Sequence, residues 1–157
     1  MPDGFHWRYN AYGGQPIIKQ FVMKDTETLT VGDMLNLESG EVDLGVTADT
    51  ALVGAMASAD DPKAERNTSH ERTPGKVAGV DSTTVVRAYI NPDAVYGCVD
   101  ANARNAGVTL DLSGATGAQT VGASVNTEFV TVERKLAAAD ETLVMIIPAL
   151  HYLTKSQ

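Results

Sequence analysis

The three histidines are the residues of this chain best suited to bind a metal or move a proton, and they lie far apart, at His6, His70 and His151. None has a second His or Cys at the short spacing that metal sites show. The segment 70–74 (HERTP) begins like the helix of a zinc protease, but Pro74 stands where a second His is needed. We therefore expect no metal site, and we interpret this segment as an exposed loop.

The acidic residues and the single cysteine give no stronger indication of catalysis. The segment 100–107 (DANARNAG) begins like a calcium-binding loop, but Arg104 occupies a ligand position and the glycine comes two residues late. Cys98 lies between valines on a predicted strand, which is typical of a small core residue and not of a nucleophile. Phosphate-binding glycine loops and serine-nucleophile motifs are absent from the sequence. We expect no catalytic residue, no cofactor and no enzymatic activity.

Aromatic residues gather at the start of the chain and are the best candidates for binding a partner. Phe5, Trp7, Tyr9 and Tyr12 all fall within the first twelve positions, among glycines. An N-terminal segment frays unless something ties it down, and aromatic side chains can supply such an anchor on the same subunit or on a neighbour. We predict an extended N-terminal arm over residues 1–14 with these four residues as its contacts.

The composition indicates one globular domain that avoids polyanions. The chain has 157 residues, 43% of them hydrophobic, and 20 acidic residues against 12 basic ones give a formal charge of −8. This charge repels nucleic acid and anionic lipid, so we expect neither as a direct partner. The first residues do not resemble a signal peptide, and the longest apolar stretch, 143–150, is too short to span a bilayer. We expect synthesis and retention in the cytosol.

Short β-prone segments separated by turn residues dominate the rest of the chain, and they predict a mainly β fold, a small barrel or sandwich. The predicted strands are 34–37, 42–44, 51–56, 83–90, 95–99, 108–112, 129–132 and 143–148. The turn 91–93 (NPD) predicts a hairpin between the strands on either side. One short helix is expected at 101–106, capped by Asp100 and ended by Gly107. Residues 15–157 form the single domain, with a long polar exposed loop at about 58–82.

Four segments of the predicted strands and turns share a common pattern: 29–42 (LTVGDMLNLESGEV), 49–56 (DTALVGAM), 85–99 (VVRAYINPDAVYGCV) and 108–114 (VTLDLSG). They resemble segments of head-decoration proteins, also called capsid cement, of tailed double-stranded DNA bacteriophages. The resemblance implies binding to the outer face of an assembled shell of major capsid protein, often as a homotrimer. It implies a structural virion protein, located on the capsid surface after synthesis in the host cytoplasm, that stabilises the capsid and reaches neighbours with a terminus.

Three other interpretations remain open at this stage. The aromatic arm could pack on its own domain and contact no partner. The chain could be a trimeric β-fold nucleotide hydrolase, because the segment 107–111 ends in Asp111, where such enzymes carry a carboxylate. It could also be a carbohydrate-binding β-barrel in which Trp7 and the tyrosines stack on sugar rings.

Overall fold

The computed structural model describes residues 4–58, 76–78, 85–123, 125–135 and 141–154. The elements, in chain order, are β1 (His6–Asn10), β2 (Ile18–Val22), β3 (Thr28–Thr30), β4 (Met34–Glu38), β5 (Glu41–Leu44), β6 (Leu52–Ser58), β7 (Lys76–Ala78), β8 (Val85–Tyr89), β9 (Ala94–Cys98), β10 (Thr109–Ser113), β11 (Thr120–Ala123), β12 (Phe129–Thr131), β13 (Thr142–Ile146) and the 3₁₀ turn η1 (Pro148–Leu150). The mainly β prediction is confirmed. No helix within the described residues has the length and hydrophobicity needed to cross a bilayer.

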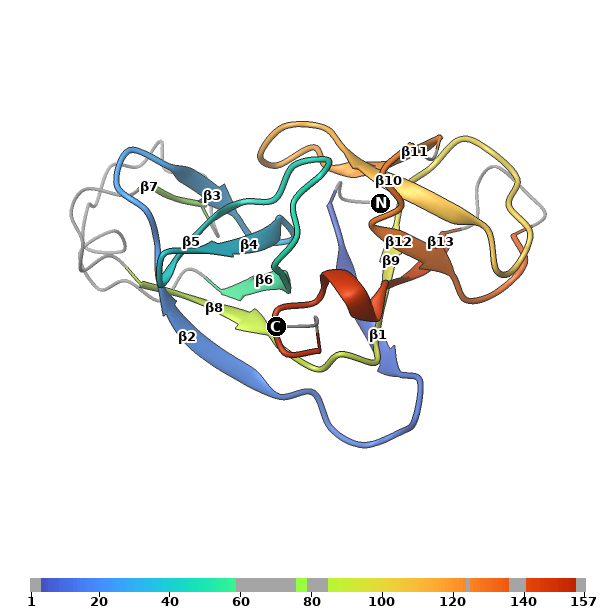
Figure 1. Ribbon diagram of the computed structural model, residues 1–157, viewed down its shortest axis with the longest axis horizontal. Helices are drawn as coiled ribbons and strands as arrows, with labels where there is room; N and C mark the ends of the chain where they lie inside the picture. The colour runs from blue at the N-terminus through green and yellow to red at the C-terminus, as the bar shows by residue number, and fades with distance from the viewer. Residues whose placement is uncertain (1–3, 59–75, 79–84, 124, 136–140, 155–157) are drawn as a thin grey trace.

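The strands form two antiparallel sheets that pack as a sandwich and do not close into a barrel (Figure 1). One sheet has the order β1-β9-β13-β12-β10-β11 and the other the order β2-β8-β6-β4-β5, while β3 pairs with β7. In each sheet the two edge strands approach one another at one end. In the six-stranded sheet the Gly4 N–H, just before β1, donates to the Gln119 carbonyl, just before β11. In the five-stranded sheet Met23, just after β2, forms a bridge with Val42 of β5. Each sheet is therefore strongly curled, as the right-handed twist of strands favours.

Two hydrophobic clusters form the core. The larger lies between the sheets and combines residues of both, among them Met34, Leu52 and Ala55 of one sheet with Leu110 and Phe129 of the other. The smaller fills the curl of the five-stranded sheet. Burial of apolar area in these clusters is the main force that holds the sandwich together.

Buried polar side chains connect the loops of the two sheets. Asp33, which is fully buried, accepts a hydrogen bond from the backbone N–H of Gly117 at 2.8 Å. Gln119 is also buried: its Oε1 accepts the Met34 N–H at 2.6 Å, and its Nε2 donates to the Gly45 carbonyl at 2.8 Å. The sheets are thus held in one relative position by directional bonds as well as by apolar contact.

Glu128 makes a further connection of the same kind. Its carboxylate is fully buried and accepts the N–H of Leu112 on β10 at 3.0 Å. It also accepts the N–H of Ala48, in the loop between β5 and β6, at 2.5 Å. This buried carboxylate therefore ties the two sheets together without a neighbouring cation among its described contacts.

The predicted hairpin at 91–93 is wrong. The turn does reverse the chain, but β8 belongs to the five-stranded sheet and β9 to the six-stranded one. Asn91 and Asp93 bond the segment after β1 instead of closing a two-stranded ladder. The turn therefore carries the chain from one sheet to the other.

Three other predictions need correction. Residues 101–106 form bends and a turn instead of a helix, because Arg104 pairs through its backbone with Lys135. The predicted loop 58–82 is not entirely irregular, because Ser58 ends β6 and Lys76–Ala78 form β7, which pairs with β3. The other residues of the predicted loop, including the segment 70–74, lie outside the described residues. The expected arm is part of the fold from residue 4 to residue 10, where β1 forms a sheet edge.

Candidate interaction surface

Strand β1 is fixed to the body of the domain by its side chains as well as by its pairing with β9. The Trp7 ring stacks on Tyr89 of the other sheet with centroids 6.0 Å apart, and its Nε1 donates to Asn10 Oδ1 at 3.0 Å. On the outward face, Arg8 forms an ion pair with Glu141. The hydrogen bond to Glu141 raises the pKa of Arg8, so the guanidinium keeps its charge.

The four aromatic residues predicted as partner contacts divide into two groups. Phe5 is 1% exposed and stacks on Phe129 in the main core, at 5.1 Å between centroids, so it is not available to a partner. Trp7 is partly buried against the same core. Tyr9 and Tyr12 are exposed, at 36% and 91%. The structure thus places the first two with the body of the domain and leaves the last two on the surface.

The connection between β1 and β2 is held firmly at both ends. The Tyr12 N–H donates to Asp93 Oδ2 at 2.9 Å, and the Ile17 N–H donates to Asn91 Oδ1 at 2.6 Å. Within the connection, buried Asn10 donates from Nδ2 to the Gln15 carbonyl at 3.1 Å. These bonds fix the backbone that carries the exposed side chains, so little backbone entropy remains to be lost on binding.

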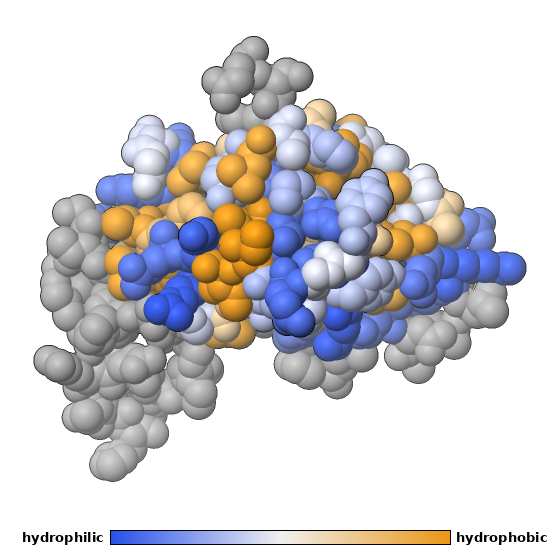
Figure 2. Space-filling view, turned by 90° about the horizontal axis from the view of Figure 1, so that it is seen from below, coloured by the Kyte–Doolittle hydropathy of each residue, from blue (hydrophilic) through white to orange (hydrophobic). Residues whose placement is uncertain are grey.

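Two isoleucines extend the exposed surface beyond the tyrosines. Ile17 and Ile18 are 49% and 41% exposed. We define the β1–β2 surface as Tyr9, Tyr12, Ile17 and Ile18. Figure 2 shows the face at the bottom of Figure 1, where this connection runs, and hydrophobic residues gather in a central patch there. The sequence alone did not single out these two isoleucines as partner contacts.

Tyr9 is the polar member of this surface. Its hydroxyl donates to Glu133 Oε1 at 2.8 Å. Partial burial and this hydrogen bond raise the pKa of Tyr9, so the phenol stays protonated. An amphipathic ring held in one position in this way is the side-chain type that protein interfaces favour.

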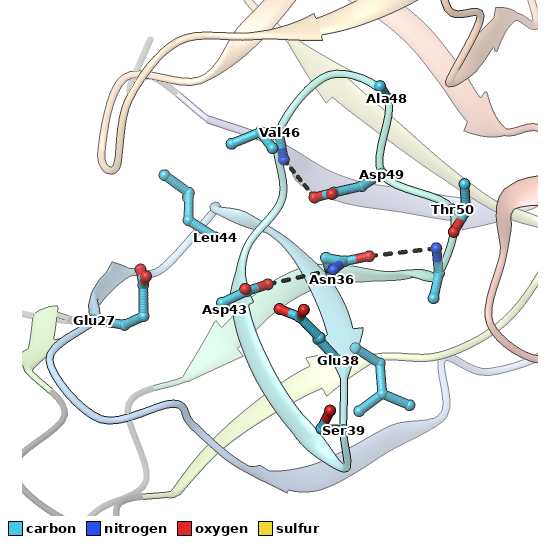
Figure 3. Close-up of a pocket in the computed structure, with 12 residues that line it drawn as sticks. Glu27, Asn36, Glu38, Ser39, Asp43, Leu44, Val46, Ala48, Asp49 and Thr50 are labelled. Carbon is cyan, nitrogen blue, oxygen red and sulfur yellow. Dashed lines mark hydrogen bonds between the residues drawn. The ribbon is translucent and has the colours of Figure 1, made fainter.

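A separate groove lies on the five-stranded sheet, and it is acidic (Figure 3). Its volume is about 590 Å³, and four carboxylates line it: Glu27, Glu38, Asp43 and Asp49. Among them, Asp43 accepts from Asn36 Nδ2 at 3.4 Å and Asp49 accepts the Val46 N–H at 2.8 Å. Burial raises the pKa of Asp43 and of Asp49.

Polar groups of this groove are paired with one another and with the local backbone. Lys24 forms ion pairs with Glu38 at 3.2 Å and with Asp43 at 3.7 Å, and Asn36 and Asp49 bond the local backbone. Across the described residues, no three His, Cys, Asp or Glu side chains are placed to hold a metal ion. The polar groups of the groove mainly stabilise its own turns.

The two residues considered for chemistry have structural roles. Cys98 is fully buried on β9, as predicted, and burial raises the pKa of its thiol to about 12. Asp111 accepts the backbone N–H groups of Val125, Asn126 and Thr127 at 2.8, 2.9 and 2.7 Å. Desolvation alone would raise the pKa of Asp111, but these donors outweigh it and lower the pKa. Asp111 therefore holds the loop before β12.

Comparison with known proteins gives no relative: no family model, no curated protein and no solved structure matches the chain.

Proposed function

We propose that this protein is a structural interaction subunit that docks to other proteins through the β1–β2 surface, as a decoration subunit on the outer face of an assembled phage capsid. Its partner is the major capsid protein, and the subunit itself forms a homotrimer on the virion. The carrying observation is Tyr12, an aromatic side chain 91% exposed on a backbone that Asp93 and Asn91 hold in place. The resemblance noted in the sequence supplies the identity of the partner.

The surface has the chemistry of a protein interface. Tyrosine is among the residues that supply most of the binding energy in such interfaces. Removal of one hot-spot side chain costs about 2 kcal/mol or more of binding free energy. Ile17 and Ile18, at the far end of the same connection, add exposed apolar area. Because the connection is already fixed by hydrogen bonds, docking costs little ordering of the backbone.

The rigid body behind the surface also supports this proposal. Buried Gln119 and Glu128 lock the two sheets together, so the domain presents one shape to a partner. A subunit that stabilises a shell by bridging neighbouring capsid subunits must itself be rigid, because a flexible domain would let those capsid subunits move relative to one another.

The alternatives have less support. The nucleotide-hydrolase interpretation rested on Asp111, and its carboxylate is occupied by three backbone N–H groups. The carbohydrate interpretation used Trp7 as a stacking platform, but that ring already stacks on Tyr89 and packs against the core. We retain docking to protein as the proposed function.

The test is co-sedimentation with capsids assembled from the major capsid protein of the same genome. Wild-type protein should sediment with the particles, and the double variant Tyr12→Ser, Ile18→Ser should bind at least about 10-fold more weakly, a change of about 1.4 kcal/mol. Val125→Ser is the matched control, because Val125 is 84% exposed and lies on a different loop. Its binding and the melting temperatures of all variants should stay at the wild-type values.

Two results would count against the proposal in different ways. If wild-type protein does not bind capsids, the decoration role is wrong. If it binds and the double variant binds equally well, docking uses another surface. Light scattering measures the oligomeric state of the free protein. If the protein is a monomer in solution and also binds the particle as a monomer, the proposed homotrimer is wrong.

A further inference from the structure

The end of the described chain forms a small unit of its own, which we name the C-terminal strap, residues 148–154. It begins with η1 and turns back on itself, since Thr154 N–H donates to the His151 carbonyl at 3.0 Å. The Thr154 hydroxyl also donates to the Pro148 carbonyl at 2.6 Å. Pro148 and Leu153 are exposed. Most of the strap thus lies on the surface, and few of its residues attach it to the domain.

Three residues attach the strap to the body of the domain, and the first of them, Leu150, packs against the main core cluster. His151 forms a parallel bridge with Leu52 of β6, and the N–H of Tyr152 donates to the Leu52 carbonyl at 2.9 Å. The Tyr152 ring meets Phe21 of β2 edge-on, with centroids 6.0 Å apart. In Figure 1 the strap is the red segment at the C-terminal end of the ribbon. The position of the strap therefore depends on Leu150 and on the His151–Tyr152 pair.

The His151 imidazole is fully buried and its hydrogen bonding fixes its neutral form. Nδ1 accepts the Leu153 N–H at 3.2 Å, so its lone pair is in use and the ring proton resides on Nε2. Nε2 faces the backbone of Val53 but makes no hydrogen bond of normal geometry. The neutral ring thus has one good bond, through Nδ1, whereas the Val53 backbone favours the charged ring and burial outweighs that effect.

Among the described residues, no charged group acts on the ring to stabilise a cation. From β6 it meets Leu52 and Val53, and from the strap it meets the Tyr152 ring, with centroids 5.2 Å apart. Tyr152 is the one titratable group beside it among the described residues, and burial raises the pKa of that phenol, which stays neutral in acid. Burial likewise lowers the pKa of His151 to about 4.

We propose that His151 is a proton-operated latch, which holds the C-terminal strap on β6 while its ring is neutral and releases the strap when the ring is protonated. A proton on Nδ1 turns the acceptor of the Leu153 N–H into a second donor facing it, and it places a charge in an apolar site. Both effects are relieved when the strap lifts and the ring enters water. Lifting also uncovers Leu52 and the Phe21 side of β2, the strand that carries Ile18 of the β1–β2 surface.

The size of the effect follows from the two states of the ring. In the lifted strap the pKa of His151 returns to its ordinary 6.5, while in the closed strap it is about 4. Linkage then makes the opening constant rise by about 30-fold when the pH falls from about 7.5 to about 5. Opening is favoured by acid because the lifted strap binds the proton and the closed strap does not.

The experiment is hydrogen exchange of the Tyr152 amide, which is bonded to the Leu52 carbonyl only while the strap is closed. After correction for intrinsic exchange, its protection factor should fall by about 30-fold between about pH 7.5 and about pH 5. The amide of Met34, bonded to Gln119 in the core, reports global opening and should stay better protected than the Tyr152 amide at both pH values. Equal protection of the two amides, or no loss at Tyr152, overturns the latch.

His151→Asn is the matched variant, because the Asn Oδ1 can replace Nδ1 as the acceptor of the Leu153 N–H and does not titrate. Its Tyr152 protection should not depend on pH over the same range, and a pH dependence equal to the wild type overturns the proposal. If the variant does not fold, the NMR titration of the wild-type ring decides. A midpoint near 4 supports the latch, and an ordinary midpoint near 6.5 with an unchanged Tyr152 amide excludes it. No capsid is needed, so the result is independent of the docking proposal.

Discussion

Replacing Gln119 by leucine tests whether directional bonds hold the sheets in place. Its amide acts as an inserted peptide group: Oε1 accepts the N–H of Met34 and Nε2 donates to the carbonyl of Gly45. Gly45 in turn donates to the Met34 carbonyl at 2.7 Å, which completes a closed set of three hydrogen bonds. Leucine has a similar volume and neither polar atom, so Gln119→Leu leaves a buried donor and a buried acceptor without partners.

The expected cost can be worked out from these two groups. Met34 is 0% exposed and Gly45 is buried, so water cannot replace the lost bonds without opening the core. An orphaned buried polar group costs about 1–3 kcal/mol, and part of the sum is offset by the greater hydrophobicity of leucine, which leaves about 3 kcal/mol. For a domain of this size that loss lowers the melting temperature by about 10 °C.

Urea unfolding followed by the fluorescence of Trp7, the one tryptophan of the chain, measures this cost directly. Trp7 stacks on Tyr89 of the opposite sheet, so its emission reports the packing of the two sheets. Gln15→Leu is the control, because Gln15 is exposed, and it should change stability by less than about 0.5 kcal/mol. A loss below about 1 kcal/mol for Gln119→Leu, with an unchanged urea dependence, would refute the reasoning.

A second substitution at position 119, Gln119→Glu, should make the folded protein more stable in acid, whereas acid usually destabilises folded proteins. In Gln119→Glu the ionised carboxylate faces the Gly45 carbonyl, whereas the protonated form can donate to it and still accept from Met34. The folded state therefore raises the pKa of the introduced carboxyl, and the stabilisation is present below its unfolded pKa and lost as the pH rises through the folded one. Relative to wild type, this variant should gain stability as the pH falls.

Two further predictions concern β6 and β9. Gly54 has φ +149°, and an added Cβ would lie 2.0 Å from the Tyr89 carbonyl oxygen, so Gly54→Ala should cost about 3 kcal/mol or more in urea unfolding. Gly13→Ala, at φ +84° with open space around it, should cost only about 1 kcal/mol, and equal costs would contradict the steric argument. Burial raises the pKa of the Cys98 thiol to about 12. At mildly alkaline pH a thiol reagent should therefore label the unfolded protein but not the native protein. Rapid labelling of the native protein would show that the Cys98 site opens to solvent.

The strands could be predicted from sequence because each is a short β-prone run between turn residues, as with Met34–Glu38 before the turn at Ser39 and Gly40. The pairing of the strands could not. Residues 91–93 favour a turn, but a turn serves a hairpin and a crossing between sheets equally well. The outcome depends on long-range contacts such as Trp7 with Tyr89, which no local pattern contains.

The missed helix has a similar cause. Asp100 does accept the Asn102 N–H at 3.3 Å, as a helix cap would, so the local prediction was physically sound. Its carboxylate also bonds Arg104, and the Arg104 backbone pairs with Lys135 from a distant segment. The pairing satisfies backbone groups that a helix would have needed.

The aromatic residues at the start of the chain are evident in the sequence, but their division between core and surface could not be predicted. Phe5 and Tyr12 are both aromatic residues near glycines, yet one is 1% exposed and the other 91%. The difference arises because Phe5 lies at the start of a strand that reaches Phe129, while Tyr12 follows that strand on a connection braced by Asp93. Burial here depends on the tertiary partner and not on residue type.

The order of strands in the larger sheet has a consequence for biosynthesis. β1 is made first, but its neighbour in the sheet is β9, and β9 in turn lies against β13. On the ribosome the N-terminal strand therefore has no permanent neighbour until residues 94–98 have emerged. Chains with such distant pairing fold slowly, on the order of milliseconds to seconds, so Phe5 and Trp7 are exposed to chaperones for much of the translation of this chain.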